Sequence, residues 1–362
     1  MEYDLLVVGN GFDLGCEFKT TYNDFINYSY ALGVRNSLFN LFMSAINNKV
    51  LRNDEWNGFE KLLCQYLQFI DFLYKGNEYV KSYFSNEFED FDGTKKYQYY
   101  NWEIPDLSKV PNNIYIILHL LNPLENVLMY YSDNNFRNHI TSSSNKEYKS
   151  VYIRALINVN MMFASKKYVI EELLKLLENR LEDVEKKLKK YISIATNKDT
   201  TGPIALRGKT VKKIITFNYS KTAQKVFNIN DEDIAYVYGS VDDDVVLGVE
   251  SSMISEQSVE EESDYIKFFK RFRRIYKDCN KSYNHKIINA LSPSSNIAIY
   301  GHSLDLSDRS ILKPLFENRY NKYDIYCYGN KNEYKVKLAK LIGLDLYDEL
   351  EKEDKINLIA IV

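Results

Sequence analysis

The stretch YDLLVVGNGFDLG, residues 3–15, decides the fold class of this 362-residue chain. An apolar run over residues 3–8 stops at the Gly-Asn-Gly turn of residues 9–11, a pattern typical of a buried strand that enters a tight turn. Residues 12–32 continue as a loop and then a helix. A buried strand, a glycine-rich turn and a helix make up the opening unit of many parallel α/β proteins.

Short β-rich runs recur after residue 205, and most of them end in Gly or Asn. They are VKKIITFN (211–218), IAYVYG (234–239), DVVLGV (244–249), NIAIYGHS (296–303), YDIYCYG (323–329) and INLIAIV (356–362). Helical patterns separate the later runs, at residues 264–277, 308–320 and 331–343. This alternation of strand and helix predicts a parallel, doubly wound sheet.

The middle of the chain has a helical pattern. Apolar residues recur at three-and-four spacing over residues 34–90, and a long amphipathic helix with Glu/Lys pairs lies within residues 148–196. We therefore predict an α/β protein with a Rossmann-like parallel sheet and a large helical insertion. The discontinuous core comprises residues 1–30 and 205–362, and the insertion comprises residues 31–204.

The composition excludes several classes of protein. A formal net charge of −3 gives no overall attraction to nucleic acid or to an anionic membrane. The N-terminus has no basic segment before an apolar one, and no stretch is long enough to span a bilayer, so we expect a cytoplasmic protein. The cysteines are far apart and form no C-x-x-C pair, so we expect neither a disulfide framework nor a bound metal. They are Cys16, Cys64, Cys279 and Cys327.

Four short motifs follow predicted strands. They are GNG (9–11), FNY (217–219), YG (238–239) and GHS (301–303). Because ligands of parallel sheets bind outside the carboxyl ends of the strands, the four motifs together predict a nucleotide site at that edge. A glycine turn lets the backbone approach a phosphate and offers N–H groups to it. The dinucleotide pattern G-x-G-x-x-G is broken at Leu14, which disfavours a hydride-transferring dehydrogenase.

Three side chains in these motifs are candidates for chemistry. The amide of Asn218 both donates and accepts hydrogen bonds, so it can orient a water or a ribose hydroxyl. Asp13 can bind a ribose, polarise a water or cap the next helix. His302 is the candidate for acid–base catalysis, because imidazole titrates near neutral pH. The other histidines have no glycine turn beside them and are interpreted as structural: His119, His139 and His285.

Two helical stretches and one loop lie outside these four motifs. Trp56 and Glu60 are four residues apart and share a helix face, with Trp56 expected to pack and Glu60 to reach the cleft. Residues 267–277 form a basic amphipathic helix, interpreted as a solvated face, with a nucleic-acid or partner contact as the alternative. The acidic stretch 248–264 is expected to be a loop.

Taken in order, the motifs resemble those of the bacteriophage abortive infection AbiH family, which is similar to a distant branch of the SIR2-like superfamily. The stretches that carry the resemblance are VVGNGFDLGCEFKTTYNDF (7–25), WNGFE (56–60), ITFNYS (215–220), YG (238–239), LGVE (247–250) and YGHSLDLSD (300–308). The resemblance implies a role in defence against phage, in which infection leads to arrest or death of the host cell. Through the SIR2-like proteins it implies cleavage of NAD+ between nicotinamide and ribose.

The resemblance also implies roles for residues at matching positions. Asn218 matches the catalytic Asn of an Asn-Tyr motif, with His302 and Asp13 as the other candidates for catalysis. The implied nucleotide-binding residues come from all four motifs: Gly9, Asn10, Gly11, Phe12, Tyr219, Tyr238, Gly239, Gly301, Ser303 and Asp308. The implied partners are NAD+ or a related nucleotide and a phage-derived trigger. No membrane partner is expected, nucleic acid is disfavoured, and homo-oligomerisation is left open.

One position departs from the pattern. The related enzymes carry a His-Gly pair where this chain has Tyr238-Gly239. A phenol with a pKa near about 10 is a poor base at neutral pH. Three alternatives follow: His302 takes over the proton transfer, the activity is altered, or the site binds a nucleotide as a sensor or adaptor without catalysis.

Overall fold

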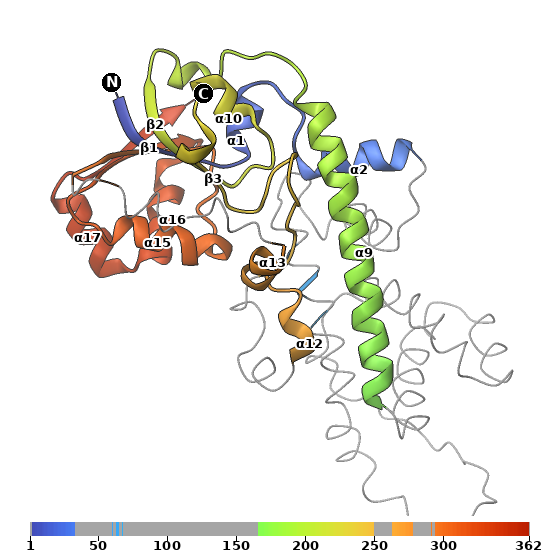
Figure 1. The fold of residues 1–362 in the computed structure, drawn as a ribbon. Coiled ribbons are helices and arrows are strands. Elements are labelled where there is room, and N and C mark those ends of the chain that lie inside the picture. The colour runs from blue at the N-terminus through green and yellow to red at the C-terminus, as the bar shows by residue number, and fades with distance from the viewer. Residues whose placement is uncertain are drawn as a thin grey trace, which may run out of the picture.

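The computed structural model describes residues 2–32, 60, 63, 64, 67, 166–249, 263–277, 291 and 294–361. Its centre is a six-stranded sheet, shown in Figure 1 with the strands of both chain ends side by side. The strands are β1 (Glu2–Val8), β2 (Thr210–Thr216), β3 (Ile234–Tyr236), β4 (Asn296–Tyr300), β5 (Lys322–Tyr328) and β6 (Ile356–Ile361). Six of the seven runs predicted as strands therefore form strands.

The strand order is β3-β2-β1-β4-β5-β6, and every neighbouring pair is parallel. The predicted parallel sheet is confirmed. The chain builds outward from β1 to β3 on one side and then returns to place β4 on the other side of β1. In doubly wound sheets, ligands bind at such a reversal, outside the carboxyl ends of the two central strands. Here those ends are the turns that follow β1 and β4.

The run at residues 244–249 was predicted as a strand, and this prediction is wrong. Its single β-bridge joins Val249 to Phe269. Its backbone N–H groups find other acceptors, since Val246 donates to the carbonyl of Tyr238 and Leu247 donates to the carboxylate of Glu185. The segment is apolar because its valines are buried, so the burial alone produced the strand-like pattern.

Two hydrophobic cores cover the two faces of the sheet. Successive residues of β1 alternate between them, since Leu5 and Val7 belong to one core and Leu6 and Val8 to the other. All four are fully buried, which explains the continuous apolar run in the sequence. A sheet buried on both faces is the arrangement that the alternating strand and helix pattern predicted.

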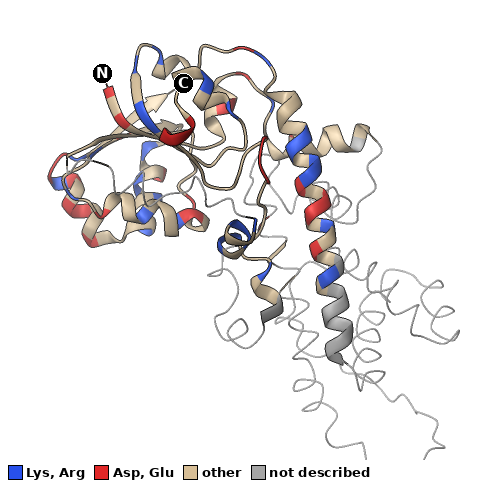
Figure 2. Ribbon diagram, in the orientation of Figure 1, with Lys and Arg blue, Asp and Glu red and all other residues tan. Residues whose placement is uncertain are grey.

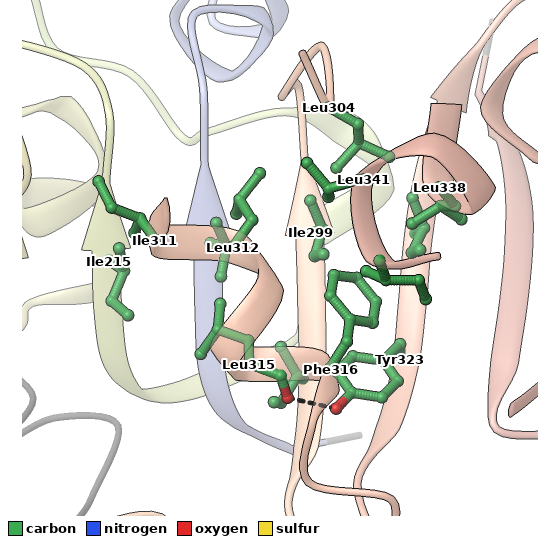
Figure 3. Packing of buried hydrophobic residues seen from close by; sticks show 14 of the residues in the cluster. Ile215, Ile299, Leu304, Ile311, Leu312, Leu315, Phe316, Tyr323, Leu338 and Leu341 are labelled. Atoms are coloured by element: carbon green, nitrogen blue, oxygen red, sulfur yellow. Dashed lines mark hydrogen bonds between the residues drawn. The ribbon is translucent and has the colours of Figure 1, made fainter. Parts of the chain in front are cut away.

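Helices on each face supply the other half of each core. The first core lies under α15 (Arg309–Phe316), α16 (Lys331–Ile342) and α17 (Leu344–Lys352). In Figure 3, Leu312 and Phe316 of α15 pack toward Ile299 of β4, and the hydroxyl of Tyr323 donates to the carbonyl of Leu315 at 2.5 Å. The second core lies under α1 (Gly11–Gly15) and α10 (Thr222–Phe227).

Local sequence sets several helix boundaries. The Asn330 side chain accepts from the N–H of Asn332 at 2.9 Å and caps the start of α16. Asn228 adopts a left-handed conformation, with φ of 50°, and ends α10. Short 3-10 turns connect longer elements in the described part of the chain, among them η2 (Ile204–Leu206), η3 (Asp231–Asp233) and η6 (Leu306–Asp308).

The remaining described helices extend away from the sheet (Figure 1). α2 (Tyr22–Ala31) packs against the long α9 (Lys166–Ala195), which confirms the helix predicted there. The predicted helix at residues 264–277 is instead two short helices, α12 (Ser263–Ile266) and α13 (Lys270–Tyr276). No described helix is both long and apolar enough to cross a membrane.

Several predictions fall outside the described residues. They concern Trp56, Cys279, His119, His139, His285, most of residues 34–90 and most of the acidic stretch 248–264. The division into a discontinuous core and an insertion at residues 31–204 stays a prediction.

Candidate functional site

The turns after β1 and β4 are in backbone contact. The N–H of Gly9 donates to the carbonyl of Tyr300 at 3.1 Å, and the N–H of Gly11 donates to the carbonyl of Gly301 at 2.9 Å. A Cβ on Gly11 would lie 2.6 Å from the Cα of Gly301. Gly301 itself has φ of +66°, and its Cβ would lie 2.4 Å from the carbonyl carbon of Gly11.

These contacts explain why glycine occupies the two turns. Neither turn has room for a side chain, and Gly301 also needs a conformation that other residues rarely adopt. The sequence predicted that the N–H groups of the first turn bind an anion. In the structure, two of these donors are already engaged, since Gly9 donates to the last residue of β4 and Gly11 donates to the turn after it.

A buried carboxylate lies directly after the first turn. Asp13, in α1, is 2 % exposed. The hydroxyl of Ser220 donates to its two carboxylate oxygens, at 2.8 and 2.7 Å. Ser220 follows the FNY motif in the loop between β2 and α10. The contact therefore joins the loops that follow β1 and β2, which are neighbours in the sheet.

Two more polar side chains lie close to this carboxylate. Asn218 and Thr222 are buried, and the Nδ2 of Asn218 and the Oγ1 of Thr222 have no hydrogen-bond partner among the described residues. Burial raises the pKa of Asp13 to about 6, and the nearby Ser220, Thr222 and Asn218 oppose that rise. We call Asp13, Asn218, Ser220 and Thr222 the Asp13 cluster.

A second buried group surrounds His302, which follows β4. Its Nε2 lies 3.2 Å from Oδ2 of Asp308, and its Nδ1 accepts from the N–H of Leu304 at 2.9 Å. A nitrogen that accepts from a backbone N–H carries no proton, so the imidazole proton is on Nε2 and is donated to Asp308. Both ring nitrogens of His302 are therefore engaged.

Asp308 collects further partners. The hydroxyl of Tyr238 donates to its Oδ1, and the ammonium of Lys270 lies 4.0 Å from the same oxygen. Burial alone would raise the pKa of Asp308, but the charge of Lys270 and the bonds from His302 and Tyr238 lower it to about 2. Lys270 also lies over the ring of Tyr238, 4.5 Å from its centroid.

Glu60 completes this second group, because it forms an ion pair with Lys270. The sequence predicted that Glu60 reaches the cleft, and it does reach the residues around Asp308. Burial raises the pKa of Glu60 to about 7, while the charge of Lys270 acts in the opposite direction. We call Asp308, His302, Tyr238, Lys270 and Glu60 the Asp308 cluster.

Among the predicted site residues, Asp13 and Asn218 thus lie in one cluster, and Tyr238, His302 and Asp308 lie in the other, at one edge of the sheet. The ring of Phe217 packs edge-on against His302, with centroids 4.3 Å apart, whereas the next residue, Asn218, lies by Asp13. Neighbouring residues of an extended chain point to opposite faces, so the FNY motif contributes to both clusters. Tyr238 belongs to the core under α15 to α17, and Phe12 belongs to the core under α1 and α10.

A scan against protein families matches the chain to the family described as "Bacteriophage abortive infection AbiH", over residues 5–120 and 122–328. The chain belongs to the AbiH family. This match confirms the family that the order of motifs indicated, and it supports a role in abortive infection by phage. No curated protein and no solved structure matched the chain.

Other residues predicted to bind the nucleotide in this AbiH protein have varied surroundings. The side chain of Asn10 accepts from the hydroxyl of Thr20 at 2.8 Å, and Phe12 packs in the core against Tyr300. The hydroxyl of Tyr219 donates to the carbonyl of Val246. Ser303 is exposed at the edge of the second turn, next to the buried His302. Gly239 has φ of +80°, so its position also favours glycine.

The basic segment 267–277 of the AbiH protein was interpreted as a solvated face, and for three of its basic residues this interpretation is wrong. Lys270, Arg273 and Arg274 are all less than 10 % exposed. The positive charges of Lys270 and Arg273 meet acidic side chains that the sequence did not pair with them, and Arg274 lies over the ring of Tyr238. The carboxylate of Glu185, on α9, binds Arg273 at 2.8 Å and Lys277 at 2.5 Å. Figure 2 shows the basic α13 beside the charged α9.

Ser220 and Thr222 were not singled out by the sequence. Both follow the FNY motif within four residues of Asn218, so the loop after β2 was the place to look for them. Among the described residues, no group of three or more His, Cys, Asp and Glu side chains is arranged to hold a metal ion. Cys16, Cys64 and Cys327 are buried, and none of the three is in a disulfide.

Proposed function

We propose that this AbiH protein is an abortive-infection effector that acts in the cytoplasm and cleaves NAD+ between nicotinamide and ribose. The observation that carries the proposal is the Asp13 cluster. It combines a buried carboxylate with two buried polar atoms, on Asn218 and Thr222, that have no hydrogen-bond partner among the described residues. The cluster lies at the carboxyl ends of β1 and β2, beside the reversal in strand order where doubly wound proteins bind nucleotides.

The two polar atoms fit a hydroxylated ligand. A buried polar group without a partner costs free energy, so natural proteins nearly always provide one as protein, water or ligand. The amide of Asn218 donates, and the hydroxyl of Thr222 both donates and accepts. A ribose hydroxyl or a water molecule satisfies both. The pyrophosphate of NAD+ would need donors other than the N–H groups of Gly9 and Gly11, which already donate to the carbonyls of Tyr300 and Gly301.

The reaction makes modest demands on such a site. Breaking the bond between C1′ and the pyridinium nitrogen leaves positive charge on the ribose and returns the bonding electron pair to nicotinamide, which departs as a neutral molecule. No strong acid is required at the leaving group. The protein must hold the ribose, place a water at C1′ and take one proton from it. In this proposal Asn218 positions the ribose or the water.

The test is a metabolite profile of phage-infected cells that express the wild type or Asn218→Ala. We expect NAD+ to fall and nicotinamide and ADP-ribose to rise with the wild type, and no change with the variant. Asn332→Ala, at an exposed position in α16, is the matched control and should deplete NAD+ like the wild type. Infected cells that arrest growth with normal NAD+ would contradict the proposal.

A second function, a nucleotide-binding sensor or adaptor without catalysis, is favoured by the Asp308 cluster. There both nitrogens of His302 and the hydroxyl of Tyr238 are engaged within the protein, so neither is set to exchange a proton with a ligand. This function predicts that NAD+ stabilises the purified protein, by ~2.7 kcal/mol at a hundredfold excess over the dissociation constant, with no turnover. Thermal unfolding with and without NAD+, followed by analysis of the nucleotide, separates the two functions.

A further inference from the structure

We infer that Asp13, and not His302, accepts the proton of the attacking water, and that Ser220 and Thr222 are positioning residues for this step. The inference rests on the proposed NAD+ cleavage and assigns the base for it. The water lies between the carboxylate of Asp13, the Nδ2 of Asn218 and the Oγ1 of Thr222.

The charge environment of Asp13 supports this role. Among the described residues, no Lys, Arg or His side chain forms an ion pair with it, and its hydrogen bonds come from the neutral hydroxyl of Ser220. A carboxylate holds about four lone-pair sites, so acceptor capacity remains for a further donor. A buried carboxylate without a cation is costly, and such groups are typical of sites that take up a proton.

Two polar atoms without hydrogen-bond partners among the described residues lie beside this carboxylate. Asn218 is 6 % exposed and Thr222 is 4 % exposed. Both side chains lie close enough to the carboxylate of Asp13 to lower its pKa, although no hydrogen bond of normal geometry joins either of them to it. A water molecule that donates to the carboxylate and accepts from the amide of Asn218 satisfies these groups together. Two to four polar partners are what an ordered buried water requires.

The hydrogen bonds of His302 disfavour it as the base. Its Nδ1 accepts from Leu304, and its Nε2 donates to Asp308. To act as a base it would have to release the backbone N–H of Leu304, which is itself buried. In this arrangement His302 orients the turn after β4 and so holds the contact with the turn after β1.

The acidity of Asp13 suits the assigned role. Burial raises its pKa to about 6, so the group is ionised at neutral pH and binds a proton more readily than an exposed aspartate. The titratable side chains that interact with Asp13 from neighbouring elements are Cys16, after α1, and Tyr236, in β3. Burial raises the pKa of both well above neutrality, so neither changes its charge between pH 5 and 8.

Atoms and charge balance in this step. The water oxygen forms a bond to C1′ while the bond from C1′ to the pyridinium nitrogen breaks, and its electron pair stays with nicotinamide. One water proton passes to the carboxylate of Asp13, which later releases it to solvent. The products are nicotinamide, ADP-ribose and one proton, with no oxidant or reductant involved.

The test compares purified wild type, Asp13→Asn, Thr222→Val and His302→Gln in steady-state NAD+ hydrolysis between pH 4.5 and 8. In the wild type we expect kcat to fall below pH ~6, the acidic limb of a single ionisation. Asp13→Asn should reduce kcat by ~100-fold or more and remove that limb, with NAD+ binding within about threefold of the wild type. Thr222→Val keeps the side-chain volume and should lower kcat by ~10-fold.

Asp4→Asn is the matched control, because Asp4 is near the start of β1, at the opposite edge of the sheet, and should leave kcat within about twofold. Retention of the acidic limb in His302→Gln supports the inference, even if kcat falls. An Asp13→Asn protein with near wild-type kcat, or loss of the limb in His302→Gln alone, overturns it while leaving the proposed function standing. A wild type that leaves NAD+ intact overturns both.

Discussion

Two aspartates at the same edge of the sheet show how differently a protein can treat the same buried group. Asp13 is 2 % exposed and Asp308 is 8 % exposed. The pKa of Asp13 is raised to about 6, whereas the pKa of Asp308 is lowered to about 2. Asp308 has Lys270, His302 and Tyr238 as partners, and Asp13 has the hydroxyl of Ser220.

The difference teaches that burial does not decide the state of a carboxyl group, because the partners do. A carboxylate paired with a cation and two donors contributes to stability as long as it stays charged. A buried carboxylate whose partner is a neutral hydroxyl keeps a raised pKa and therefore binds a proton more readily. We therefore interpret the Asp308 cluster as the support of the site and the Asp13 cluster as its reactive part.

The largest effect is expected from removing the anion of the Asp308 cluster. Asp308→Ala leaves the hydroxyl of Tyr238 and the Nε2 of His302 without their acceptor, and removes one of the carboxylates near the ammonium of Lys270. Loss of one partner from a buried charged group destabilises a protein by about 3–5 kcal/mol. Denaturant unfolding at pH 7 measures this loss, and a change below about 1 kcal/mol would contradict the supporting role.

The next effect tests the contact that fixes the distance between the two clusters. Gly301→Ala places a Cβ against the backbone of Gly11 at a position with positive φ, and we expect a loss of about 3 kcal/mol. Gly329→Ala is the matched control, since it has φ of +83° but nothing within 4 Å of its Cβ. The control should lose only the conformational part, about 1 kcal/mol. Equal losses in denaturant unfolding would mean that the crowding at Gly301 is unimportant.

The third effect is a gain of stability. The folded-state pKa of Asp13 is above the unfolded value, so its contribution is favourable below pH ~4 and is lost as the pH rises through ~6. Asp13→Asn should therefore match the wild type near pH 4 and exceed it above pH 6. The limit is ~3 kcal/mol for a shift of about two pKa units, and we expect ~2 kcal/mol because an amide accepts less well from Ser220.

The gain in stability of Asp13→Asn is measured by comparing its unfolding free energy with that of the wild type from pH 4 to 8. Asp308→Asn provides the opposite reference, because the pKa of Asp308 is lowered in the folded state. Its contribution is present above pH ~4 and is lost as the pH falls toward ~2. An Asp13→Asn variant that is less stable than the wild type at pH 8 would show that the comparison between the two aspartates is wrong. A gain, combined with lost turnover, is the usual exchange of stability for activity.

The smallest effect concerns the hydroxyl of Tyr238. Tyr238→Phe removes the hydroxyl that donates to Asp308 and leaves the ring in place over Phe217 and under Lys270. We expect a loss of about 1.5 kcal/mol, as for a hydrogen bond to a charged group. Turnover should keep at least half of its wild-type value. A loss of turnover as large as that of Asp13→Asn would place Tyr238 in the reaction.

Much of the fold follows from local sequence. Buried parallel strands give apolar runs that stop at glycine, and these runs located the six strands and the turns at Gly9 and Gly301. The run at residues 244–249 misled because its burial comes from side-chain packing, while its N–H groups bind Tyr238 and Glu185. Periodicity reports burial and does not report which acceptor a backbone N–H finds.

The site was predicted less completely. The motifs were correctly placed at one edge of the sheet, but their separation into two clusters depends on which face each side chain takes. The alternation of side chains along β2, continued to Phe217 and Asn218 just after it, already contains that information. The burial of the basic α13 was not predictable from its own sequence, because it depends on Glu60 and Glu185, which are distant in the chain.

The ion pairs that hold α13 in place have a practical consequence for truncated versions of the protein. Its cations Lys270 and Arg273, and Lys277 just after it, take their anions from Glu60 and Glu185. Both glutamates come from the stretch that a shortened version of the protein would omit, residues 31–204. Such a fragment would keep every strand of the sheet and yet lack the two glutamates that pair with Lys270, Arg273 and Lys277. Expression of the strands alone is therefore expected to give an unfolded or aggregating product, and the intact chain is the unit to purify.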